Sequence, residues 1–194
     1  MPVGAGTPRL QRASLRLWEA VEAARARRMR TVLYHSALKL HTEGRTRTLE
    51  LMPAFIDSAS PPLLTGPVGA GLAGRLRVFR YQLVCTDVEA LPDEQWAVES
   101  PQVLAHDESV ARAIIALAPA VPPYTWGRRV RGTSEMWTSD SVISWLLLRA
   151  GVDLAAMHIP AGGRAPGWEA GLEVASRGLY SMEIGGRQEG PGRR

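Results

Sequence analysis

One segment constrains the fold more than any other. Residues 139–150 (SDSVISWLLLRA) have the length of a helix and are apolar on nearly every side. A helix at a protein surface keeps a polar face, so a helix of this composition has to be surrounded by other parts of the chain. Gly151 follows directly and is typical of the residue that ends a helix. We therefore expect residues 139–150 to form a central buried helix.

Residues 31–52 predict a β-hairpin. Two segments rich in β-forming residues flank Glu43-Gly44, a pair suited to a tight turn. With that turn, Ala37 faces Glu50 and His41 faces Thr46. One face of the hairpin then carries four leucines and resembles a core face: Leu38, Leu40, Leu49 and Leu51. The opposite face carries the titratable side chains: His35, Lys39, His41 and Glu50.

Five further segments carry secondary-structure signals. Residues 8–29 have apolar residues at three- and four-residue spacing, which predicts an amphipathic helix. Residues 107–118 predict a short helix, because its acidic start suits the helix dipole. Residues 75–86 and residues 171–175 predict strands. Residues 57–74 are rich in proline and glycine and predict a loop.

These elements indicate one α+β domain in residues 31–180. An added helix lies within residues 1–30, and residues 181–194 have the composition of a disordered tail. The whole chain of 194 residues is long enough to bury a core without disulfides.

Composition excludes several classes of protein and of site. Cys85 is the single cysteine, so there is no internal disulfide and no cysteine-cage metal site. The four histidines supply few further ligands for a metal centre, and we expect no metal. Residues 69–74 formally match G-x-G-x-x-G, but no predicted strand precedes them and no helix follows, so we expect no dinucleotide cofactor.

Charge and hydropathy bear on partners and location. The formal net charge is +4, and Lys39 is the one lysine among 23 basic residues. The basic residues are spread along the chain rather than interleaved with aromatics, so nucleic-acid binding is not expected. No apolar run approaches about 18 residues, which excludes a membrane-spanning helix. We expect a cytoplasmic protein, and the oligomeric state stays open.

A polar cluster stands where the central helix begins: Thr138, Ser139, Asp140 and Ser141. Helix capping is one explanation, with Thr138 or Ser139 as the cap and Asp140 in the first turn. A nucleophile is the other, because a helix N-terminus offers unpaired N–H groups and a partial positive charge that stabilise an oxyanion. A serine nucleophile also needs a histidine base.

The order of these features resembles the circularly permuted branch of the papain-like superfamily, which includes NlpC-type peptidases and lecithin:retinol acyltransferase. That branch has an early histidine in a strand, matched here by Tyr34-His35-Ser36, and a late Asn-Cys-x-x-Phe motif at a helix start, matched by residues 138–142. The chain is still more similar to uncharacterised bacterial relatives with an Asn-Ser-Asn-Ser or Asn-Ser-Asn-Thr motif. The resemblance implies an antiparallel sheet packed on the central helix.

The resemblance also implies roles for three residues. Ser139 stands where the family has its cysteine, which excludes a thiol mechanism at this position, and Thr138 replaces the preceding asparagine. His35 is then the base. Glu50, diagonally across the hairpin, is the candidate to orient His35.

Two loops on either side of the central helix are candidates for a substrate-binding rim. They combine aromatic residues, glycine and arginine, whose guanidinium group suits a carboxylate. Their candidate binding residues, together with the tryptophan beside the cluster, are Trp126, Arg128, Trp137 and Arg164. The sequence supports an acyl-transfer enzyme acting on an amide, ester or thioester in a small molecule or peptide. It equally supports a catalytically inactive papain-like binding module. A basic-surface adaptor for nucleic acid or membrane is a third alternative, with less support than the other two.

Overall fold

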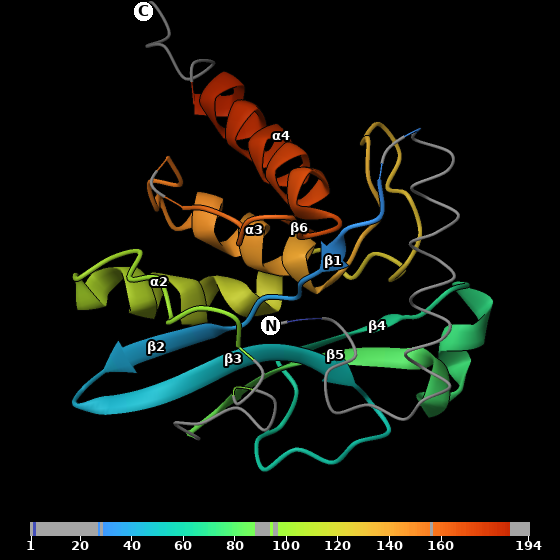
Figure 1. The fold of residues 1–194 in the computed structure, drawn as a ribbon, viewed down its shortest axis with the longest axis horizontal. Helices are drawn as coiled ribbons and strands as arrows, with labels where there is room; N and C mark the ends of the chain where they lie inside the picture. The colour runs from blue at the N-terminus through green and yellow to red at the C-terminus, as the bar shows by residue number, and fades with distance from the viewer. Residues whose placement is uncertain are drawn as a thin grey trace, which may run out of the picture.

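Helices cover one face of an antiparallel sheet, so the architecture is α+β as predicted (Figure 1). In the part of the chain that the structure describes, the sheet has four strands in the order β2-β3-β5-β4. Above it lie helices α2, α3 and α4, and α3 is between the sheet and α4. The computed structural model describes residues 2, 27, 29–87, 94, 97–155 and 157–186, with side chains to residue 177.

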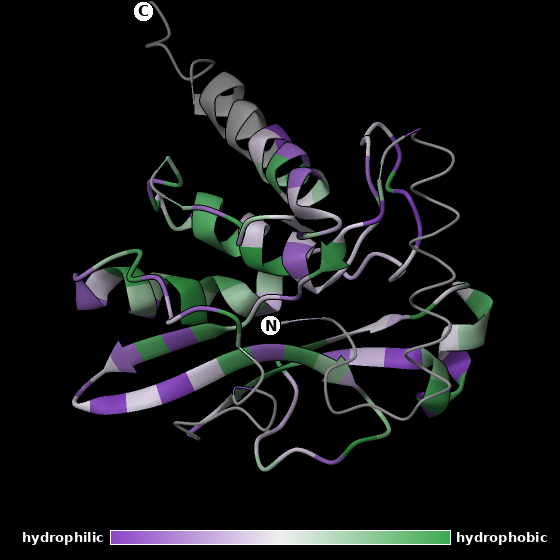
Figure 2. Ribbon diagram, in the orientation of Figure 1, coloured by the Kyte–Doolittle hydropathy of each residue, from purple (hydrophilic) through white to green (hydrophobic). Residues whose placement is uncertain are grey.

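The predicted hairpin forms with the predicted register. Strands β2 (Leu38–Thr42) and β3 (Arg45–Pro53) are antiparallel, and His41 pairs with Thr46. Glu43 and Gly44 have φ angles of 53° and 71°, so both turn residues are in the left-handed region that a tight two-residue hairpin turn requires. Figure 2 shows the resulting alternation of hydrophilic and hydrophobic residues along both strands.

The hairpin is shorter than predicted. Its ladder begins with Leu38 opposite Leu49, so the expected pair of Ala37 with Glu50 is wrong. Residues 31–37 leave the sheet instead. Within them, β1 (Val32–Leu33) pairs in parallel with β6 (Gly163–Arg164), far along the chain. No local sequence pattern predicts this pairing between distant residues. Because of it, His35 lies outside the hairpin.

The other two strands also differ from expectation. β5 (Arg80–Thr86) begins later than predicted, because two 3-10 turns, Leu72–Arg75 and Arg77–Phe79, precede it. β4 (Leu64–Pro67) lies inside the predicted loop and precedes Gly69, where no strand was expected. It is antiparallel to β5, and a 3-10 turn follows it instead of the α-helix of a dinucleotide-binding βαβ unit.

Two of the three helices match their predictions. α2 (Glu108–Leu117) begins after Asp107, whose side chain accepts a hydrogen bond from Ser109 N at 2.8 Å, and it continues into a 3-10 turn at Ala118–Ala120. α3 (Ser139–Arg149) is buried along most of its length. Val142 and Leu146 have no exposed surface, which confirms a central buried helix.

The predicted strand at residues 171–175 is wrong, because these residues belong to helix α4 (Trp168–Gly186). The buried positions Trp168, Gly171, Val174 and Ala175 follow helical spacing. A glycine inside a helix is unfavourable, so Gly171 weakens the helical pattern in the sequence. The structure explains the glycine, because α3 passes too close to this position for a side chain. A Cβ atom there would lie 2.0 Å from Ser144 Oγ and 2.1 Å from Ser141 O.

The predicted N-terminal helix at residues 8–29 falls almost entirely outside the described residues, as do residues 187–194 of the predicted tail. Helix α4 extends into the start of that tail, to Gly186. Among the described residues, no helix has the length and apolar character needed to cross a membrane.

The close contact of α3 and α4 predicts an unusual response at Gly171. Replacing a glycine inside a helix by alanine normally stabilises the helix by about 1 kcal/mol. Here Gly171→Ala should lower the free energy of unfolding by about 1–3 kcal/mol, because the added methyl group collides with α3. Urea denaturation measures the change. Gly71→Ala is the control, since nothing lies within 4 Å of a Cβ atom there. A stabilised Gly171→Ala protein would contradict the packing described.

Candidate functional site

The polar cluster caps helix α3 as the sequence suggested. Thr138 is the N-cap residue, and Asp140 N donates to its Oγ1 at 3.2 Å. Thr138 N donates in return to Ser141 Oγ at 3.0 Å, which completes a capping box. The capping explanation is therefore confirmed for Thr138, whereas Ser139 is the first residue of the helix.

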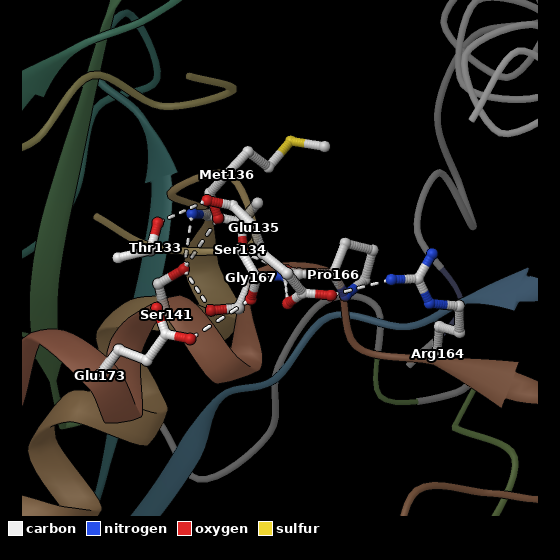
Figure 3. Close-up of polar contacts among 10 residues, drawn as sticks. Thr133, Ser134, Glu135, Met136, Ser141, Arg164, Pro166, Gly167 and Glu173 are labelled. Atoms are coloured by element: carbon white, nitrogen blue, oxygen red, sulfur yellow. Dashed lines mark hydrogen bonds and ion pairs between the residues drawn. The ribbon is translucent and has the colours of Figure 1, made fainter. Parts of the chain in front are cut away.

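Three hydroxyl groups of this region attach α3 to the start of α4. Thr138 Oγ1 donates to the carbonyl of Pro166. Ser141 Oγ donates to Gly167 O at 2.7 Å, and Ser144 Oγ donates to Trp168 O at 2.8 Å (Figure 3 shows the Ser141 contact). Because these carbonyls precede or begin α4, the hydroxyls have a structural role.

Glu135 holds the turn before α4 in place. Its Oε1 atom lies 2.8 Å from Arg164 Nη2, and its Oε2 atom accepts a hydrogen bond from Gly167 N at 2.7 Å. Figure 3 shows Glu135 between these two partners. Gly167 has a φ angle of +89°, and a Cβ atom there would lie 2.5 Å from Ser141 Oγ. A glycine is therefore required at this point.

Ser139 differs from its hydroxyl-bearing neighbours. It is half-buried, and among the described residues its hydroxyl has no hydrogen-bond partner. It also lies at the positive end of α3. Ser139 is thus the hydroxyl of this cluster that is available for chemistry.

Asp140 is the unusual group of the site. Its side chain is only 2% exposed, and it faces Ser36 and His35 on the extended segment between β1 and β2. Burial raises the pKa of Asp140 from 3.8 to about 7, although hydrogen bonding from Ser36 and the charge of His35 act to lower it. Within the part of the chain that is described, its Oδ1 atom has no hydrogen-bond partner.

The structure brings His35 to the start of α3 but places Glu50 elsewhere. Leu49 and Leu51 on β3 face the helices, so Glu50 between them lies on the opposite face of the sheet, paired with Val84. The diagonal contact expected between His35 and Glu50 required a hairpin ladder that continues past Leu38, and the ladder ends there. Asp140 is a carboxylate close enough to His35 for the two groups to interact electrostatically.

The four candidate rim residues have structural partners. Trp137 has no exposed surface and packs edge-on against Tyr124, with ring centroids 5.1 Å apart, so it belongs to the core. Trp126 is half-buried, and its backbone N–H donates to Pro67 O at 2.9 Å. Arg128 Nε donates to the carbonyl of Gly69. Arg164 is paired with Glu135.

A large groove begins beside His35. Its volume is about 940 Å³, and its apolar floor includes Ile143 and Leu147 of α3. All four histidines of the chain line it: His35, His41, His106 and His158. His35 is the one with a role expected from the sequence, and no local motif connects the other three.

The importance of Asp140 was not predicted from the sequence, where Asp140 was expected only to be an acidic residue of the first helical turn. One signal was present, because Asp140 is the one acidic residue in an otherwise largely apolar helix. Among the described residues, no group of three or more His, Cys, Asp and Glu side chains is arranged to hold a metal ion.

Comparison with models of protein families, with curated proteins and with solved structures finds no match to this chain.

The raised pKa of Asp140 predicts how stability depends on pH. Between pH 3.8 and about 7 the folded state holds a proton that the unfolded state releases, so the free energy of unfolding should fall as the pH rises through this range. Asp140→Asn should remove this decrease and be more stable than the wild type above pH 7, by up to about 4 kcal/mol. Urea denaturation at several pH values measures both effects.

Asp57→Asn is the control, because Asp57 is exposed and its partner, Arg77, lies at the surface. If the wild type and Asp140→Asn have the same pH dependence, the buried carboxyl does not titrate as described.

Proposed function

We propose that this protein is an acyl-transfer enzyme, a hydrolase or acyltransferase acting on an amide, ester or thioester carbonyl. Ser139 is the nucleophile and His35 the base. The observation that supports it most strongly is the position of Asp140, the residue after Ser139, next to His35 from a distant part of the chain. The papain-like fold implied by the resemblance would explain this meeting.

The start of α3 suits the attack on a carbonyl. As Ser139 Oγ bonds to the carbonyl carbon, His35 takes the hydroxyl proton, and the carbonyl oxygen becomes an oxyanion. The capping box uses the N–H groups of Asp140 and Ser141, which leaves the Ser139 N–H and the positive end of the helix to stabilise that oxyanion. His35 then gives its proton to the leaving group, and water or another acceptor resolves the acyl-enzyme.

Asp140 replaces Glu50 as the acidic partner of His35 in this proposal. An ionised Asp140 stabilises the protonated imidazole that forms during attack. Because the pKa of Asp140 is about 7, its ionised form becomes the major one only above that pH. Activity should therefore rise with pH across neutrality.

A catalytically inactive papain-like binding module is the second candidate. One observation favours it: Thr138, Ser141 and Ser144 use their hydroxyls to join α3 to α4, so most of the cluster has a structural purpose. For either function we propose a cytoplasmic location, which suits a chain whose single cysteine, Cys85, is free.

A fluorophosphonate probe, which labels activated serines, separates the two functions. The wild type should be labelled, and Ser139→Ala should lose the label. Ser134→Ala is the matched control, because Ser134 is exposed and its one side-chain hydrogen bond to the described residues is to Glu173, at 3.3 Å. Mass spectrometry of the labelled peptide identifies the site. A wild-type protein that stays unlabelled above pH 7, while a known serine hydrolase reacts, would favour the binding module.

A further inference from the structure

We infer that the groove beside His35 binds an extended, basic peptide segment, which adds to the sheet as a new strand along β2. This goes beyond the proposed function, because binding requires no reaction at Ser139. The inference rests on three observations: an open strand edge, a groove that follows it, and the charge of the groove.

The edge of β2 has unused hydrogen-bonding groups. Among the described strands, β2 is at the end of the sheet and has β3 as its one neighbour. The two-residue turn makes Thr42 and Arg45 a hydrogen-bonded pair, so Leu40 also turns its N–H and C=O toward β3. Lys39 and His41 turn theirs outward. In the described part of the chain no backbone hydrogen bond reaches these outward groups.

The groove follows this edge along its whole length. Residues 34–44 line it without interruption, and these include side chains from both faces of β2. Both faces can border one groove only where the groove lies along the strand edge. Residues 97–108 form the opposite wall. An extended segment lying between the two walls would pair with Lys39 and His41 as strands pair in β-augmentation.

The charge of the groove is opposite to that of the chain. The chain has 23 basic and 19 acidic residues, yet among the described residues that line the groove Lys39 is the one basic residue and no arginine is present. Five carboxylates line it: Glu43, Glu94, Glu99, Asp107 and Glu108. Three of them have partners, because Glu94 is paired with Lys39, Glu99 with His158 and Glu108 with Arg112, yet the lining still has more acidic than basic residues. A basic segment is therefore attracted, and an acidic segment is repelled.

The floor of the groove sets a further preference. It is apolar where Ile114 of α2, Ile143 and Leu147 of α3, and Met157 of the loop after α3 line it. Side chains of an added strand alternate between two faces, so one set would contact this floor and the other would point toward the carboxylates. The suited occupant alternates apolar and basic residues.

The test measures fluorescence anisotropy of a labelled Lys-Val-Lys-Val-Lys-Val peptide with the full-length protein carrying Ser139→Ala, so that catalysis cannot interfere. We expect saturable binding that weakens at higher salt. The Glu-Val-Glu-Val-Glu-Val peptide tests charge, and a basic peptide N-methylated at alternate residues tests strand pairing. Both should bind at least about tenfold more weakly.

Paired variants locate the site. His41→Pro removes an outward N–H but leaves the hydrogen bonds of β2 to β3, and it should weaken binding about tenfold, whereas His41→Val should not. Glu99→Gln should weaken binding, whereas Glu169→Gln, on the exposed side of α4, should not. Circular dichroism verifies that each variant is folded.

Each result decides the inference. Loss of binding on N-methylation and in His41→Pro supports strand addition at β2. The inference is overturned if the basic peptide does not bind, if the acidic peptide binds as tightly, or if His41→Pro binds like His41→Val. Because Ser139 is absent throughout, failure here leaves the fluorophosphonate result, and with it the proposed function, unaffected.

Discussion

The close contact between helices α3 and α4 is the constraint on which the rest of this structure depends. Ser141 and Ser144 on α3 meet Gly167 and Gly171 on the other side, and neither glycine position has room for a side chain. The buried hydroxyls of α3 have to find acceptors, because a buried polar group without a partner is costly. The carbonyls at the start of α4 supply them, which fixes where the N-terminus of α3 lies.

That position has a chemical consequence. The start of α3 meets the extended segment 35–37, so a carboxyl group of the first turn, Asp140, is buried against His35 and Ser36. Burial destabilises the charged form of Asp140, and strongly shifted carboxyl groups of this kind are concentrated at functional sites. Ser139, next to this pair and without a hydrogen-bond partner among the described residues, is why we place chemistry here rather than at the rim loops.

The sequence predicted what local patterns determine. Apolar composition identified α3, an acidic start identified α2, and the Glu43-Gly44 turn set the register of β2 and β3. Contacts between distant residues were beyond such patterns. Gly171 obscured the helical pattern of α4, because a glycine is needed there only for the close contact with α3. The pairing of β1 with β6 separates His35 from the hairpin and from Glu50. His35 and Ser139 were identified as candidates, but Asp140 as the partner of His35 was not.

The central claim is that His35 and Asp140 form one electrostatic unit at the start of α3, and carbon-13 NMR of the Asp140 carboxyl tests it directly. We predict a pKa near 7 in the wild-type protein. In His35→Ala the pKa should rise further, because the charge that favours the ionised carboxylate is removed, whereas His106→Ala should leave it unchanged. A carboxyl that titrates near 4, or one that does not respond to His35→Ala, would contradict the account.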